Sequence, residues 1–378
     1  VYLNEYNGMM TYEKNVYSLP GERLTTDISL LFCIPWLGSD GNYGTSFGIN
    51  LRQYVQPVTD ASLLAKGYDY IVRDEDGTLL YFSKPAGESE YIDEVGRGLT
   101  LSKSGTRYTL KDQSGNRLEF SQSLNGRIYL TDMYDSENNH VTIAYDTANP
   151  SRIVRVTDAG GRNATLTYNS SGLLEYIKNN AGAPVTKFTY SGKRLTQIYD
   201  YTIDCATSFT YDSYGRIASV SNEFDTIYLT YDSMYRMTSL AEGNSSNVLF
   251  TASYENYARN QTVFMHQGPG YDVTAGDAIR EVCTFNRYGQ RAGHYYTTPD
   301  GKKTLGIAGE EYSATHMGNT ETKSAIRNNN KLITSNVVYE TVNLVTNASV
   351  ENGVWPKTEW TAGMTPAAYF DLATDASY

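Results

Sequence analysis

The amino-acid sequence predicts an all-β protein, a strip of antiparallel β-hairpins that coils into a spiral or a partial, open shell. The 378 residues include 34 Tyr and 32 Gly. Tyr and Thr favour strands, whereas Gly, Asn, Asp and Ser favour tight turns. A phrase also recurs, since YDSYGRIASV at 211–220 is followed by YDSMYRMTSL at 231–240. Repeated phrases indicate stacked structural units, each covered by its neighbours.

Residues 1–75 carry strand and turn patterns without this phrase. We expect them to form a β segment that caps the first edge of the sheet, because an open edge invites aggregation. The apolar stretch ISLLFCIPWLG at 28–38 is expected to be a buried strand. The acidic string RDEDG at 73–77 could be a catalytic carboxylate pair, but such a run is more often a solvated turn. We expect the turn.

Residues 76–300 hold the repeat array. Five tyrosines close successive strands at intervals of 23, 22, 21 and 20 residues, which gives a period of about 21. They are Tyr145, Tyr168, Tyr190, Tyr211 and Tyr231. Apolar residues alternate along each strand, so each strand has one buried face. The predicted role of the five tyrosines is packing in the repeat core, and the alternative is sugar stacking along an aromatic ladder.

The second strand of each unit carries an irregular apolar pattern. Ile153 and Val156 are three residues apart, as are Ile217 and Val220. Residues on one face of a regular strand are two apart, so the spacing predicts a β-bulge or a strong local twist in every second strand. Asp, Asn, Ser and Gly between the two strands predict a hairpin turn.

The phrase YDSYGRIASV resembles the YD repeat, Y-D-x-x-G-R-[L/I]-x-x-[V/I], of the Rhs/YD-repeat family, and CTFNRYGQRAGHYY at 283–296 resembles a degenerate copy. The resemblance implies a spiral β-strip, which closes as a hollow shell in Rhs toxins, Tc toxins and teneurins. Wall-associated proteins of Gram-positive bacteria carry the same repeats. Met234 and Tyr235 stand where the family has Gly, and no D-P-x-G-[LFW] ending is found, so release of a toxin by self-cleavage is not expected.

The C-terminal part changes character again. We expect connecting strands or a linker over 301–340. The sequence NLVTNASVENGVWPKTEW at 343–360 resembles the first strand of a carbohydrate-binding jelly-roll module, so 341–378 is expected to be the truncated start of such a module. Trp355 and Trp360 would then be the glycan-binding residues. We expect further domains of the same longer polypeptide on either side.

Composition limits the partners and the chemistry. The net charge of −11 argues against nucleic acid, and no stretch approaches the roughly 20 apolar residues of a spanning helix, so membrane insertion is not expected. Neither the cysteines nor the histidines show ligand spacing, so we expect no metal and no cofactor. They are Cys33, Cys205, Cys283, His140, His266, His294 and His316. His266 lies in the longest insertion between repeats, at about 255–280, where a functional loop would most naturally sit.

Three functions follow as hypotheses. The first is a non-enzymatic, extracellular scaffold and adhesion protein of the bacterial cell surface, which binds carbohydrate or a cell-surface protein. The alternative is a fragment of an Rhs-type shell that encapsulates a toxin. A glycan-cleaving enzyme is the third, but the sequence contains no hydrolase, zinc-protease or nucleotide-binding motif, so we expect no catalytic residues.

Overall fold

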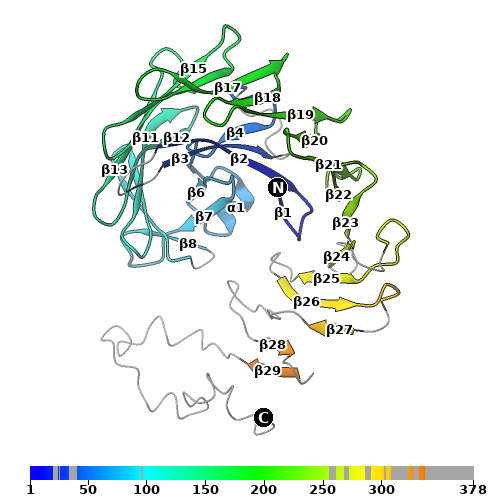
Figure 1. Ribbon diagram of the computed structural model, residues 1–378. Coiled ribbons are helices and arrows are strands. Elements are labelled where there is room, and N and C mark those ends of the chain that lie inside the picture. The colour runs from blue at the N-terminus through cyan, green and yellow to red at the C-terminus, as the bar shows by residue number, and fades with distance from the viewer. Residues whose placement is uncertain are drawn as a thin grey trace. The chain divides into compact units, whose positions relative to one another are not determined.

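The computed structural model confirms the all-β class (Figure 1). It describes residues 1–19, 24, 26–33, 41–94, 97–254, 261–267, 272–285, 291–301, 304–307, 322–326 and 332–336. Within these ranges the strands are antiparallel, the only helix is α1 (Ala61–Ala65), and no helix could cross a membrane. Two compact units divide the chain: Val1–Asn4, Met9–Arg236 and Glu242–Asn244 form the first, and Glu5–Gly8, Met237–Ala241 and the residues from Ser245 onward form the second.

The first unit begins with a four-stranded sheet, here called the N-terminal sheet. Its strands follow one another in order and are β1 (Tyr2–Leu3), β2 (Met10–Leu19), β3 (Thr26–Cys33) and β4 (Phe47–Ile49). Ile28, Leu30 and Phe32 alternate along β3 and are fully buried, as expected for the apolar stretch at 28–33. The remainder of that stretch, 34–38, lies outside the described residues.

Eight further strands close into a ring. They are β5 (Tyr54–Pro57), β6 (Tyr70–Arg73), β7 (Leu79–Ser83), β8 (Tyr91–Asp93), β9 (Thr100–Ser104), β10 (Arg107–Lys111), β11 (Arg117–Leu124) and β12 (Arg127–Tyr134). Each pairs with the next, and the start of β12 returns to β5 through Ile128 opposite Val55 and Tyr129 opposite Tyr54. Val72, Phe82 and Phe120 are among its fully buried side chains.

The ring differs from the expected arrangement of residues 1–75. The expected boundary at residue 75 falls between β6 and β7, which pair with each other. Strand β5, expected to lie in a capping segment, itself pairs with β12 and closes the ring. Closure pairs the main-chain groups that an edge strand would expose, so the ring needs no cap at that point. The acidic string at 73–77 is the β6–β7 turn, closed by the Asp74 N–H donating to the Thr78 carbonyl at 2.9 Å, as predicted.

From β12 the sheet continues as the repeat strip. Its strands are β13 (His140–Tyr145), β14 (Ile153–Thr157), β15 (Asn163–Tyr168), β16 (Leu174–Lys178), β17 (Pro184–Ser191), β18 (Arg194–Asp200), β19 (Cys205–Tyr211), β20 (Ile217–Ser221) and β21 (Thr226–Tyr231). The end of β12 starts the strip by pairing with β13. Each unit is one hairpin, as the repeat predicted.

The predicted bulge is present in every complete hairpin of the strip. Tyr145 lies opposite Ile153 but Ala144 lies opposite Arg155, which leaves one residue of the second strand without a partner across the ladder. The extra residues are Val154, Glu175, Thr196 and Ala218. The bulge returns the residue three places on to the buried face, so Ile153 and Val156 are both fully buried. The prediction is confirmed.

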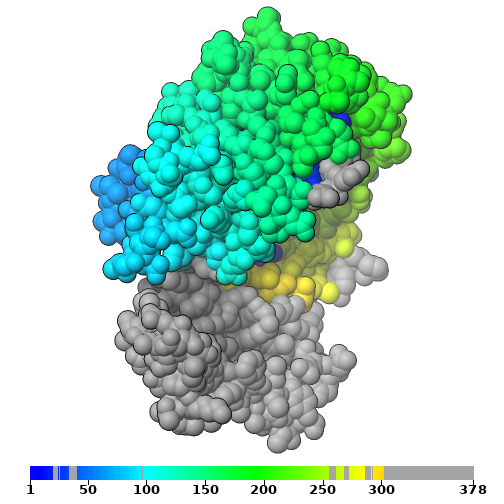
Figure 2. Space-filling view, turned by 90° about the vertical axis from the view of Figure 1, so that its left-hand side faces the viewer, coloured from blue at the N-terminus to red at the C-terminus, as the bar shows by residue number. Residues whose placement is uncertain are grey.

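The N-terminal sheet packs inside the curve of the strip (Figure 1). The Tyr12 and Phe47 rings both meet the Phe209 ring of β19 edge-on, with centroids 5.3 and 5.6 Å apart. The 41–46 segment adds main-chain hydrogen bonds, from Leu174 N–H to the Asn42 carbonyl at 2.7 Å and from Thr45 N–H to Lys193 at 2.8 Å. In the face shown in Figure 2, only small parts of the dark blue N-terminal residues are visible between the strands of the strip.

The second unit contains the remaining strands, apart from Glu242, the last residue of β22, which belongs to the first unit. They are β22 (Met237–Glu242), β23 (Val248–Tyr254), β24 (Gln261–His266), β25 (Arg280–Phe285), β26 (Arg291–Thr297), β27 (Thr304–Ile307), β28 (Thr322–Ile326) and β29 (Leu332–Asn336). Strands β22 to β27 pair consecutively, and β28 and β29 form a separate hairpin. The expected jelly-roll segment, 341–378, lies outside the described residues.

Candidate functional site

The closing tyrosines use their hydroxyl groups within the fold. In four of the five repeats the hydroxyl donates to a main-chain carbonyl of the preceding hairpin. The acceptor is the first or second residue of that hairpin's second strand, except for Tyr145, whose acceptor lies within β12. The pairs are Tyr145 to Leu130, Tyr168 to Ile153, Tyr211 to Leu195 and Tyr231 to Ile217. Burial raises the pKa of all five phenols well above the usual tyrosine range. These hydroxyls therefore link consecutive hairpins.

Tyr190 departs from this pattern. Its hydroxyl is buried without a hydrogen-bond partner, and its ring lies against Gly44 of the segment that joins β3 to β4. A Cβ on Gly44, whose φ is +102°, would stand 3.2 Å from the Tyr190 ring and 3.4 Å from Leu195. The backbone at residue 44 can therefore lie this close to Tyr190 and Leu195 because the residue is glycine.

In four of the five repeats the residue after the closing tyrosine is an Asp or Asn whose side chain accepts hydrogen bonds from main-chain N–H groups of the turn. Asp212 accepts hydrogen bonds from the Tyr214 N–H at 2.9 Å and the Arg216 N–H at 3.0 Å, and its other oxygen accepts from Arg216 Nε at 2.6 Å. Arg216 is buried and reaches the carbonyl of Asp232 in the next turn at 2.8 Å. Its guanidinium also lies over Tyr231, 4.7 Å from the ring centroid. The carboxylate of Asp212 is therefore occupied by turn formation.

The exposed apolar side chains of the strip lie at its turns. Phe224 is 82% exposed in the turn between β20 and β21, and Tyr201 and Ile203 are exposed in the neighbouring turn between β18 and β19. Tyr214 is exposed at the opposite edge. The two tryptophans expected to bind glycan, Trp355 and Trp360, lie outside the described residues.

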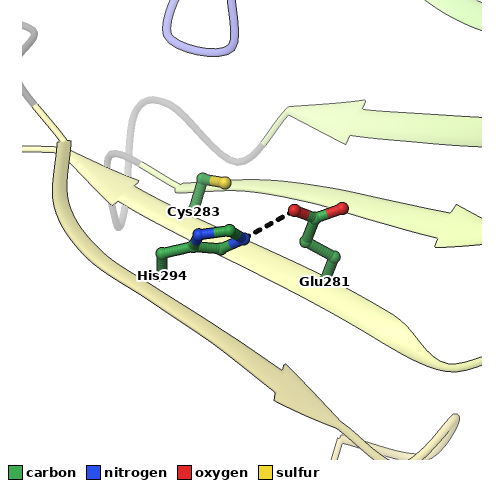
Figure 3. A group of neighbouring side chains, drawn as sticks. All are labelled: Glu281, Cys283 and His294. Carbon is green, nitrogen blue, oxygen red and sulfur yellow. Dashed lines mark hydrogen bonds and ion pairs between the residues drawn. The ribbon is translucent and has the colours of Figure 1, made fainter. Parts of the chain in front are cut away.

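One group of chemically reactive side chains comes together in the second unit (Figure 3). Glu281 and Cys283 are two residues apart on β25 and share a face, and His294 lies opposite Cys283 on β26. One ligand atom from each of the three lies within 4.8 Å of the others, the only such group among the residues that the structure describes. His266, at the end of β24, joins them through Glu281. These four residues are called the histidine–cysteine cluster.

Glu281 is the centre of the cluster. One carboxylate oxygen is 2.6 Å from His294 Nε2 and the other is 2.5 Å from His266 Nε2. The hydrogen bond from His266 lowers the pKa of Glu281 below its ordinary value, and the hydrogen bond from His294 has a weaker effect in the same direction. Together they outweigh partial burial, which acts to raise this pKa. An ionised carboxylate only accepts hydrogen bonds, so each imidazole presents an N–H to it.

Cys283 is the fully buried member of the cluster. Burial, helped by the nearby carboxylates of Glu5 and Glu281, raises the pKa of its thiol to about 12. The thiol is therefore neutral at ordinary pH. The cluster combines sulfur, imidazole nitrogen and carboxylate oxygen, the donor set that zinc takes in proteins.

Sequence reasoning did not foresee this group. Cys283 and His294 are eleven positions apart, a separation with no meaning until the register of β25 and β26 is known. The available signal was the placement of His266 in the longest insertion, together with the alternation of Glu281 and Cys283 on one strand.

Comparisons with known proteins give only distant similarities. No protein-family model matches the chain, and no curated protein matches it. The crystal structures of TcdB2-TccC3-Cdc42 and of TcdB2-TccC3 are each 10% identical in sequence to the chain, with TM-scores of 0.35. The alignments cover 72% and 78% of this chain, respectively, and 18% and 19% of the chains it is compared with.

A Photorhabdus luminescens Tc holotoxin pore with mutated TccC3 is 12% identical to the chain, with a TM-score of 0.28; the alignment covers 89% of this chain and 17% of the other. The chain thus spans less than a fifth of the length of each of the three structures. Alignments with scores this low carry no argument about function, and the fold rests on the strand pairings of the chain itself.

Proposed function

We propose that the chain is a non-enzymatic repeat scaffold of the Rhs/YD type, which acts outside the bacterial cell, at its surface, and holds neighbouring domains of the same polypeptide. The observation that carries this proposal is the packing of the N-terminal sheet on the inner face of the repeat strip. The YD phrase and its hairpin geometry support the family, because the phrase coincides with the closing tyrosine, the turn and the bulge of each unit.

The packed inner face favours a scaffold over a container. Phe209 on that face meets Tyr12 and Phe47, and Thr186 donates to the Val16 carbonyl from the neighbouring part of the strip. In this unit the chain's own strands cover the surface that would face a cargo. An array of this kind gains stiffness from its core, which suits a module that spaces other domains.

Adhesion is the second part of the proposal. Phe224, Tyr201 and Ile203 give one edge of the strip an apolar character that carbohydrate rings or a cell-surface protein could cover. A glycan array with the full-length protein tests this part. We expect binding that falls when Phe224 and Tyr201 are both changed to Ser and is kept in Tyr214→Ser, at the opposite edge. Equal binding by all three proteins would remove this edge from the proposal.

A container for a toxin remains the second candidate, because the sheet does close on itself where β12 meets β5. Purification of the full-length protein distinguishes the two functions. A scaffold should yield no second polypeptide protected from protease, whereas a container should yield a fragment that is digested only after unfolding. Release of sugar products from natural polysaccharides would contradict both functions and favour an enzyme.

A further inference from the structure

The histidine–cysteine cluster is not explained by packing or by turn formation. Free cysteine is commonly buried, but the fully buried Cys283 thiol lies near the carboxylates of Glu5 and Glu281 and opposite His294 on the neighbouring strand. Gathering two carboxylates and the His294 imidazole around a thiol costs desolvation energy, which a bound cation would offset.

We propose that Cys283, His294 and Glu281 bind one transition-metal ion of the zinc class, with His266 as a positioning residue that holds the second oxygen of Glu281. The inference concerns a site outside the repeat phrase and does not depend on the scaffold function. Thiolate and imidazole ligands favour zinc over calcium and magnesium, which take oxygen ligands.

The geometry suits such an ion. The three ligand atoms already lie within 4.8 Å of one another, and His294 Nε2 is 2.6 Å from a Glu281 oxygen. Zinc bonds of about 2.0 to 2.3 Å place tetrahedral ligand atoms roughly 3.5 Å apart. The ion would take the place of the proton shared by His294 and Glu281, so small side-chain rotations are sufficient. The backbone is fixed by the antiparallel ladder of β25 and β26.

The charge also balances. A divalent ion bound by a thiolate, a carboxylate and a neutral imidazole forms a site with no net charge, and the thiol proton leaves when the ion binds. His294 would carry its remaining proton on Nδ1. His266 would keep donating to the second Glu281 oxygen, as outer partners of metal ligands usually do. Arg291 pairs with Glu5 at 3.4 Å, so Glu5 is partly neutralised and need not be a ligand.

Zinc uptake by the purified chain tests the proposal. After chelator treatment and removal of the chelator, the chain is titrated with zinc chloride and the bound metal is measured by mass spectrometry. We expect one zinc per chain. Cys283→Ser and His294→Gln should weaken binding by more than about 100-fold, and His266→Gln by about 10- to 100-fold, the range for outer partners of metal ligands.

Two matched controls use residues elsewhere in the chain. His140→Gln removes another imidazole–carboxylate pair, in which His140 Nε2 is 2.8 Å from Asp132, and Cys205→Ser removes another thiol. Both controls should keep one zinc per chain. No zinc uptake by the unaltered chain, or the same uptake by Cys283→Ser and His294→Gln, would overturn the assignment.

Cobalt gives a readout that needs no variant. The unaltered chain loaded with Co²⁺ should show the near-ultraviolet charge-transfer band of a thiolate–cobalt bond. Absence of that band in a folded chain that binds cobalt would exclude Cys283 as a ligand. Far-ultraviolet circular dichroism of each variant separates loss of metal from loss of the fold.

Discussion

The tyrosine hydroxyls that link consecutive hairpins can be tested by a matched pair of substitutions. Tyr168→Phe removes a hydroxyl that donates to the Ile153 carbonyl at 2.8 Å. Tyr190→Phe removes a hydroxyl from the same position of the next repeat, where it is buried without a partner. Both changes keep the ring, the strand and the apolar packing, so the hydrogen bond to Ile153 is the main difference between them.

The expected effects have different sizes. The net contribution of one hydrogen bond is about 0.5 to 1.5 kcal/mol, and a buried carbonyl left unsatisfied costs about 1 to 3 kcal/mol. Tyr168→Phe should therefore lower the free energy of unfolding by about 1 to 3 kcal/mol. Tyr190→Phe should be neutral or slightly stabilising, because it removes an unpaired polar group from the interior.

Urea unfolding followed by circular dichroism measures both variants against the unaltered chain. A shift of the midpoint with an unchanged slope reports a change in stability. Thermal midpoints should move by about 2 to 4 °C per kcal/mol for a unit of this size. Equal losses in the two variants would refute the reasoning, because the ring position and not the hydroxyl bond would then carry the effect.

Three further outcomes are expected. Gly215→Ala should lower the free energy of unfolding in urea by about 1 to 2 kcal/mol, because φ at Gly215 is +84°, a left-handed conformation that alanine adopts with strain. An unchanged stability would mean that the turn accepts a side chain there, as it does at Tyr235, whose φ is +66°. Because burial raises the pKa of the repeat tyrosines, the unfolded chain loses its phenol protons first, and the free energy of unfolding should fall as pH rises above 10.0, the ordinary tyrosine value. Phenolate absorbance should then appear together with loss of the circular-dichroism signal of the β structure. Phenolate absorbance in an intact fold would contradict the burial of these hydroxyls. Because the pKa of Glu281 is lowered in the folded chain, the stability it contributes is present above pH 4.5 and is lost as pH falls through the lowered pKa. Glu281→Gln should therefore flatten the acid side of a plot of melting temperature against pH. Identical plots for the variant and the parent would show that the two histidines do not stabilise the carboxylate.

Local chemistry made the repeat strip predictable. The three-residue separation of Ile153 and Val156 breaks the alternation of a regular strand, and the register between Tyr145 and Ile153 shows that a bulge is the reason. The same holds for the Asp212 turn, because an Asp side chain that accepts from main-chain N–H groups two and four residues ahead needs no distant partner. Patterns that complete themselves within one hairpin can be read from the sequence.

Long-range pairings could not be predicted in the same way. Nothing in the residues at 54–55 indicates that they lie opposite 128–129, so closure of the ring was not foreseen. The Gly44 segment likewise shows its role only when Tyr190 is placed against it. The histidine–cysteine cluster depends on one register between β25 and β26, and a shift of one residue would turn Cys283 to the other face. In each case the contact depends on register or on packing, and neither leaves a local pattern.

Strand β12 has two neighbours on one side, β5 at its beginning and β13 at its end. The sheet therefore branches at this strand, and the array has a single growing end. Duplication of a 21-residue unit could lengthen the protein downstream of β13, whereas an extra hairpin between β5 and β12 would have to widen a closed circle. Relatives that differ in repeat number should accordingly vary after this branch and keep the eight strands before it.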